Sequence, residues 1–157
     1  TSPRRVVLIG GDFDAAIALK NRILARWSKL ALHVAPHTAS ENIMAQQWAA
    51  ALGWDSQLAD NNGAVIAVGS IDLPAFPSHM SLPIVWADLE TAIHGLPNNI
   101  QTIGHAVVDA RDPTWLNAIG ISNVKRFVPI GNMHHFGPLW DGYGFWRQLF
   151  EEIEVSI

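Results

Sequence analysis

The chain has no cysteine among its 157 residues. A disulfide framework, a thiolate metal site and a thiol nucleophile supplied by these residues are therefore excluded. No apolar run approaches the roughly 18 residues that a membrane-spanning helix needs, and no signal peptide opens the sequence. We therefore expect no membrane span and a cytoplasmic location.

Charge is also scarce. Asp, Glu, Lys and Arg make up 15 % of the chain, against roughly 25 % in an average soluble domain, whereas 49 % is hydrophobic and seven residues are tryptophan. A surface so poor in charge predicts burial against another polypeptide, so we expect either an obligate homo-oligomer or a piece of a larger protein. The formal net charge of −4 and the isolated basic pairs Arg4-Arg5 and Lys125-Arg126 give no basic patch, so we expect no nucleic-acid partner.

Short apolar runs alternate with segments of helical period. Strands are expected at 6–9, 32–35, 64–68, 84–86, 100–108 and 124–130, and helices at about 14–30, 38–52, 89–94, 113–119 and 143–153. An irregular connection is expected at 72–83. The alternation predicts one α/β domain over 1–157, three-layered, with a mostly parallel sheet.

Three local details sharpen this prediction. The run from Val6 to Ile9 reads as a buried central strand. Thr38 and Glu41 have the spacing of a capping box, which predicts a helix start there, followed by one apolar stripe through Met44, Trp48, Ala51 and Leu52. Asp88 and Asp112 are expected to cap the short helices that follow them.

A polar loop from Gly131 to Tyr143 follows the last expected strand. Binding and catalytic groups of α/β folds gather in such loops, so we expect a site lined by His134, His135, Phe136 and Trp140. Asp141 could act as an acid or base, but its place favours an N-cap of the last helix. The alternative is that the loop is structural, with the aromatic residues packed in the core.

Two other motifs favour structural interpretations. Gly10-Gly11-Asp12 lacks the Gly-x-Gly-x-x-Gly spacing of a dinucleotide fingerprint, so a tight turn explains it better. The adjacent His134 and His135 have no Asp, Glu or His partner at ligand spacing, which predicts no metal site.

Three stretches, in the correct order, resemble the acyl-CoA reductases of the aldehyde dehydrogenase superfamily, relatives of the subunit that makes fatty aldehyde for bacterial bioluminescence. The opening Thr1-Ser2-Pro3 is similar to the residues after the superfamily's nucleophilic cysteine. The segments 83–93 and 99–104 resemble an acidic-Leu-Glu-x-Ala helix and a Leu-Gln-Thr-Val-Gly strand. The segment 126–143 is similar to the signature Arg-hydrophobic-Val-Pro-x-Gly … Phe … Trp-Asp-Gly-Tyr.

The resemblance implies the C-terminal portion of a larger enzyme, beginning directly after the catalytic cysteine, with a fold like the catalytic domain of aldehyde dehydrogenases. That cysteine would take the acyl group of an acyl-CoA or other fatty acyl thioester, and the acyl-enzyme would accept hydride from a nicotinamide cofactor and release an aldehyde. Thr1, Ser2 and Gln101 would join the loop in lining the site. The chain by itself should be inactive.

The same resemblance implies that the missing N-terminal portion is a partner and binds most of the cofactor, NADP or NAD. The superfamily's Glu-x-Phe-Gly-Pro motif, which holds the nicotinamide ribose, corresponds here to Ala75-Phe76-Pro77, without a glutamate. The choice of cofactor therefore stays open. The alternative function is a stand-alone, non-catalytic α/β module that binds a ligand or partner through the loop.

Overall fold

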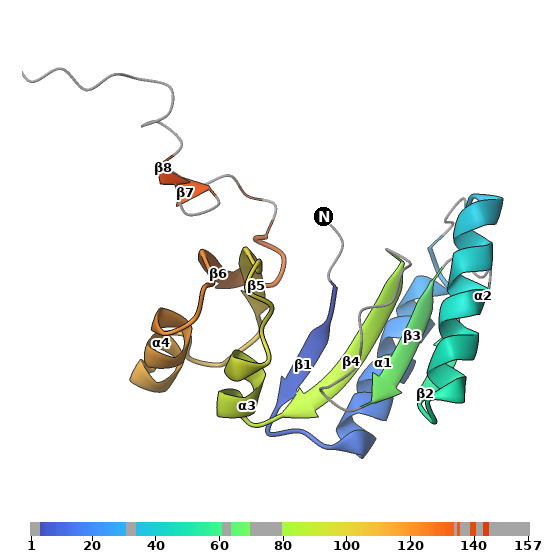
Figure 1. Cartoon of the computed structure of the whole chain (residues 1–157), viewed down its shortest axis with the longest axis horizontal. Coiled ribbons are helices and arrows are strands. Elements are labelled where there is room, and N and C mark those ends of the chain that lie inside the picture. The colour runs from blue at the N-terminus through green and yellow to red at the C-terminus, as the bar shows by residue number, and fades with distance from the viewer. Residues whose placement is uncertain are drawn as a thin grey trace, which may run out of the picture. The chain divides into compact units, whose positions relative to one another are not determined.

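The computed structural model describes residues 4–30, 34–60, 64–69, 80–133, 135, 139–140 and 143–144, the last four by their main chain. The chain divides into two compact units, Thr1–Gly95 and Leu96–Ile157. Each unit contains its own β-sheet (Figure 1). That the whole chain acts as one domain stays a prediction.

The first unit is built on a four-stranded sheet. Its strands, in spatial order, are β1 (Val6–Ile9), β4 (Ser81–Ala87), β3 (Val65–Gly69) and β2 (Asp55–Leu58). The strands β1 and β3 run parallel to β4, and β2 runs antiparallel to β3. The α/β class with a parallel-rich sheet is thus confirmed. The central position predicted for β1 is wrong, because β1 lies at one edge of this sheet.

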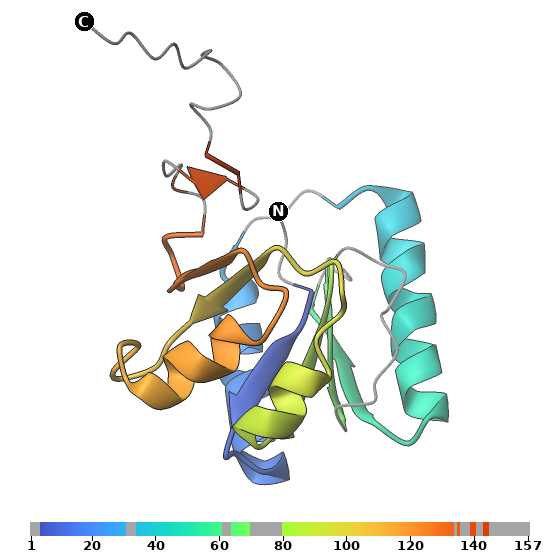
Figure 2. The same ribbon diagram turned by 60° about the vertical axis from the view of Figure 1, so that its left-hand side comes forward.

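Two helices cover the opposite faces of this sheet (Figure 1), and a shorter helix, α3, contacts β1 (Figure 2). Their bounds are α1 (Phe13–Trp27), α2 (Pro36–Ala51) and α3 (Leu89–His94). Because side chains alternate along a strand, Ile66 and Val68 of β3 join the α1 cluster, while Val65 and Ala67 pack against α2. The first unit therefore has three layers, and its core lies on both faces of β3.

The start of α2 differs from the prediction. The helix begins at Pro36, with Ala35 as an N-cap that makes no side-chain cap hydrogen bond. Proline suits the first helical turn because its missing N–H would have no intrahelical partner there. Thr38 is therefore a buried residue within the helix, and the predicted capping box is wrong. Val34 and Ala35 precede the helix outside any strand, and residues 32–33 of the strand expected at 32–35 lie outside the described residues.

Two strands extend beyond the sequence-based expectation. The strand β2 was not predicted, and β4 begins at Ser81, so residues 81–83 of the expected irregular connection are in a strand. Pro83 lies within β4, one residue before the pairing with β1 begins at Ile84. A proline disturbs a sheet least where no neighbouring strand needs its missing N–H as a hydrogen-bond donor. Residues 72–79 lie outside the described part.

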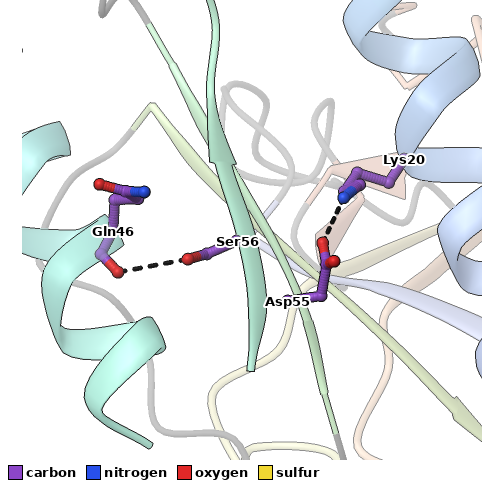
Figure 3. A network of polar contacts seen from close by, with 4 residues as sticks. All are labelled: Lys20, Gln46, Asp55 and Ser56. Carbon is purple, nitrogen blue, oxygen red and sulfur yellow. Dashed lines mark hydrogen bonds and ion pairs between the residues drawn. The ribbon is translucent and has the colours of Figure 1, made fainter. Parts of the chain in front are cut away.

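Polar contacts from β2 tie the two helix layers to the edge of the sheet (Figure 3). The ammonium group of Lys20, on α1, forms an ion pair with the Asp55 carboxylate. The next residue, Ser56, points to the other face and donates a hydrogen bond of 3.3 Å to the carbonyl oxygen of Gln46 on α2. Successive residues of one edge strand therefore hold α1 and α2 in place.

The second unit contains a parallel strand pair and a small antiparallel pair. Its elements are β5 (Thr102–His105), α4 (Pro113–Gly120), β6 (Arg126–Pro129), β7 (Leu139–Trp140) and β8 (Tyr143–Gly144). The helix α4 connects β5 to β6 and lies beside them (Figure 2). The prediction that a helix starts at Tyr143 is wrong, because Tyr143 pairs with Trp140 as part of β8. Residues 145–153 lie outside the described residues.

Candidate functional site

The candidate site follows the strand pair β5–β6 in the second unit. Their parallel register pairs Thr102 with Arg126 and His105 with Pro129, so both strands end at the same edge. The loop that begins at Ile130 leaves from this edge, and the Ile130 N–H donates a 2.8 Å hydrogen bond to the His105 carbonyl oxygen. The chain is therefore fixed to the carboxyl end of β5 directly before the predicted polar loop begins at Gly131.

A tight contact brings the loop onto one face of the pair. Gly131 has a φ of 99°, a left-handed conformation that glycine adopts without steric cost, and it redirects the chain after β6. Met133 then packs against Gly104. A Cβ atom at position 104 would lie 2.5 Å from Met133 Sδ, so the Met133 side chain could pack this closely only against a glycine and would have to shift for any other residue.

Arg126 holds the loop from the same face. Its guanidinium donates from Nη1 to the Met133 carbonyl oxygen at 3.2 Å and from Nη2 to the His135 carbonyl oxygen at 3.0 Å. The guanidinium reaches the two acceptors from two separate nitrogen atoms in a rigid plane, whereas an ammonium would have to donate to both from one nitrogen atom. Arg126 thus clamps the main chain on both sides of position 134.

The opposite face of the strand pair carries an aromatic stack. The His105 ring lies 4.2 Å from the Phe127 ring at 24°, and Phe127 lies 6.3 Å from Trp115 of α4 at 19°. The Nδ1 atom of His105 is buried and has no hydrogen-bond partner among the described residues. Buried polar atoms in native structures are nearly always hydrogen-bonded, so this one calls for an explanation, such as a bound water or ion.

The structure places only some of the predicted site residues. Thr1, Ser2, His134, Phe136 and Asp141 lie outside the described residues, and Trp140 is described by its main chain in β7. His135 is exposed in the clamped loop. Gln101 lies before β5, where its carbonyl oxygen accepts the N–H groups of Lys125 and Arg126, each at 3.0 Å. Gln101 is thus at the amino end of the strand pair, and His135 is in the loop that follows the carboxyl end.

Three aspartates that follow strands or turns act as helix caps. Asp12 accepts a 2.8 Å hydrogen bond from the Ala15 N–H at the start of α1, which supports a structural interpretation of Gly10-Gly11-Asp12. Asp88 and Asp112 cap α3 and α4, as predicted. The backbone N–H of Thr91 holds the pKa of Asp88 below its usual value, and that of Thr114 does the same for Asp112. Carboxylates stabilised in their charged form suit capping better than proton transfer at neutral pH.

Sequence reasoning missed two residues of this site, Arg126 as a clamp and His105 in the stack. His105 lies in an apolar run, where a single histidine reads as part of a strand. Arg126 could have been found through the signature that begins with it, but its hydrogen bonds depend on tertiary structure. The described groups here can form hydrogen bonds, and no described residue supplies a thiol.

Comparison of the chain with models of known protein families, with curated proteins and with solved structures found no match. Among the residues in the described ranges, no group of three or more His, Asp or Glu side chains is placed to hold a metal ion. No described helix has the length and apolar character needed to cross a membrane.

Proposed function

We propose that this chain is the C-terminal portion of an acyl-CoA reductase, which reduces a fatty acyl thioester to an aldehyde with NADPH or NADH through a cysteine acyl-enzyme. Under this proposal its fold corresponds to part of the catalytic domain of aldehyde dehydrogenases. The nucleophilic cysteine would directly precede Thr1, in a portion of the enzyme that also binds most of the cofactor.

The observation that carries the proposal is the agreement between three similar segments and the elements that they form. The acidic-Leu-Glu-x-Ala segment forms the capped helix α3, and the Gln-Thr-Ile-Gly segment leads into β5. The Arg-Phe-Val-Pro segment forms β6, and the glycine that follows it has the positive φ that the turn requires. The order helix, strand and strand is the one that the resemblance implies for these segments.

The clamped loop gives the proposal a specific role for this portion. Arg126 and Gly104 hold Met133 and His135 beyond the carboxyl end of β5–β6, the edge at which α/β folds place their ligands. We assign to His134 and His135 the acyl or nicotinamide side of the site. Rigid support of a loop that lines a reacting centre is what accurate positioning of substrate requires.

The test is an activity measurement on the longest polypeptide encoded by the reading frame that contains this chain. Incubated with a fatty acyl-CoA and NADPH or NADH, it should release the fatty aldehyde and consume one reduced nicotinamide for each aldehyde. The matched control replaces the cysteine before Thr1 by serine and should lose the activity. A polypeptide that binds acyl-CoA without reducing it would instead favour the non-catalytic binding module.

A further inference from the structure

Basic residues gather in the first 30 positions of the chain. This segment contains six of the ten Lys and Arg residues but only two of the fourteen Asp and Glu residues. No acidic residue lies between Asp14 and Glu41, so the whole second half of α1 is free of negative side chains. Positive charge is therefore concentrated on α1, in a chain that is acidic as a whole.

Three of these cations form one surface, which we call the basic stripe. Arg22 and Arg26 lie one turn apart on α1, and Lys29 lies in the turn directly after the helix, where its N–H donates a 3.2 Å hydrogen bond to the Arg26 carbonyl oxygen. All three residues are exposed. In the part of the chain that the structure describes, no carboxylate forms an ion pair with any of them, whereas the buried Lys20 of the same helix is paired with Asp55.

Helix stability accounts for only part of the basic stripe. A cation near the carboxyl end of a helix interacts favourably with the macrodipole, and Arg26 lies in the last turn. This effect falls off within one turn, so it does not explain Arg22. The apolar side chains of this half of the helix pack against the core instead, namely Leu19, Ile23, Leu24 and Trp27. The stripe is thus a charged surface without an apolar centre.

We propose that the basic stripe binds an acidic segment of another polypeptide, one that presents its carboxylates along one face of a helix. A planar guanidinium can donate two parallel hydrogen bonds to one carboxylate, so Arg22 and Arg26 can each hold one. Carboxylates three and four residues apart on a partner helix have the same spacing as the three cations. Each cation then meets one carboxylate.

The distribution of charge favours a polypeptide over a lipid bilayer or a nucleic acid. Both of these are extended anions, and they would also approach the acidic remainder of a chain whose net charge is −4. Three cations also neutralise too few phosphates for firm binding of a nucleic acid. An acidic segment, in contrast, can confine its negative charge to the stripe.

The composition of the stripe favours a partner that binds and dissociates. Permanent interfaces are the more hydrophobic ones, and no exposed large apolar residue lies between Arg22 and Lys29 in the sequence. Complementary charges mainly increase the rate of association and select the partner. The occupant that we infer is therefore a separate protein. This inference is independent of the proposed enzymatic function.

The test measures the fluorescence anisotropy of a labelled, alanine-rich helical peptide that is titrated with the full 157-residue chain at low ionic strength. The peptide carries three glutamates at the spacing of the basic stripe. Wild-type chain should bind it, and the binding should weaken as salt is added, because exposed ion pairs are screened. The same peptide with glutamine in place of each glutamate should not bind.

Matched variants locate the binding surface. R22Q/R26Q should raise the dissociation constant at least about threefold, because two exposed ion pairs are lost. The control R111Q/K125Q removes the same charge at two exposed residues outside the stripe and should bind like the wild type. Circular dichroism spectra equal to that of the wild type show that both variants are folded.

The proposal is overturned if the wild-type chain does not bind the glutamate peptide, or if the two double variants weaken binding equally. Binding to phosphatidylserine vesicles in place of the peptide would show that the stripe serves a lipid surface instead. The longest polypeptide encoded by the reading frame should also bind the peptide. If it does not, the stripe is covered within the same protein, and the inference of a separate partner is wrong.

Discussion

Arg126 donates a hydrogen bond from Nη2 to the carbonyl oxygen of His135 over 3.0 Å, and its Nη1 reaches the carbonyl oxygen of Met133 at 3.2 Å. One side chain from the first residue of β6 thus holds the main chain on both sides of position 134. Replacing Arg126 by Ala should release this loop. A hydrogen bond from a charged donor is worth roughly 1.5–3 kcal/mol, and the partial exposure here reduces the expected loss to about 1 kcal/mol.

The amide protons of residues 130–135 should therefore exchange roughly five- to tenfold faster in Arg126→Ala, as measured by hydrogen–deuterium exchange with mass spectrometry. Arg126→Lys keeps the charge but loses the two separate donor nitrogens of the rigid fork, so its exchange rates should lie between those of the wild type and the alanine variant. Lys125→Ala removes the same charge from the neighbouring position and is the control. Equal exchange in all four proteins would show that Arg126 does not hold the loop.

Gly104 and Met133 should be energetically coupled. In Gly104→Ala the new Cβ would lie 2.5 Å from Met133 Sδ, and a flexible thioether can move, so the free energy of unfolding should fall by about 1–2 kcal/mol. The double variant with Met133→Ala should cost less than the sum of the two single changes. Chemical denaturation measures all three. Gly120→Ala is the control: no atom lies within 4 Å of a Cβ there, and α4 should gain up to about 1 kcal/mol. Additive costs would contradict the contact.

Lys20 and Asp55 form one ion pair, but replacing Asp55 should lower the free energy of unfolding more than replacing Lys20. The Lys20 side chain is 7 % exposed and that of Asp55 is 40 % exposed. Asp55→Asn leaves a buried ammonium without a negative partner and should cost about 2–3 kcal/mol. Lys20→Met keeps the apolar stem and leaves a carboxylate that water can reach, so it should cost about 1 kcal/mol or less. Urea denaturation of both variants checks the order, and a larger loss in Lys20→Met would contradict it.

The caps at Asp88 and Asp112 should make stability depend on pH on the acid side. The pKa of each carboxyl is lowered in the folded state, chiefly by the N–H groups of Thr91 and Thr114, from an ordinary value of 3.8. A lowered folded-state pKa gives stability that is present above pH 3.8 and is lost as the pH falls through the folded-state pKa.

Asparagine caps helices as well as aspartate but does not titrate. The double variant D88N/D112N should therefore have a melting temperature near that of the wild type at pH 6 and lose less stability between pH 5 and pH 3. Thermal melts followed by circular dichroism measure this difference. Identical pH profiles for the two proteins would show that the caps do not contribute.

Local signals in the sequence were sufficient for several elements. The β-branched runs of β1 and β3 and the apolar period of α1 predicted their positions within a few residues, because burial and propensity agree there. The caps at Asp88 and Asp112 were also predicted. In contrast, β2 reads Asp-Ser-Gln-Leu, which has little strand propensity. It is a strand because it pairs with β3, and only the tertiary structure shows that pairing.

The predictions for α2 and for the last helix differ from the structure for two different reasons. The apolar stripe predicted for α2 contains Met44, Trp48 and Leu52, which are exposed, whereas close packing against β3 admits alanines at 45 and 49. Before Tyr143, the dipeptide Asp141-Gly142 is one that favours two-residue hairpins. The prediction of a helix from Tyr143 rests instead on the apolar period that follows it. The His105 ring stacks on Phe127, 22 positions along the chain, and Arg126 bonds across a turn to residues seven and nine positions away, so no helical or strand period predicts these contacts.

The acyl-enzyme is the most direct test of the proposed function. The polypeptide encoded by the complete reading frame should be incubated with palmitoyl-CoA in the absence of a nicotinamide, and its mass determined before and after treatment with hydroxylamine. We expect the mass of one palmitoyl group to be added to a cysteine directly before Thr1 and to be removed by hydroxylamine. The 157-residue chain, which has no cysteine, should gain no mass under the same conditions. A residue other than cysteine before Thr1, or a stable adduct on the 157-residue chain, would contradict the proposal.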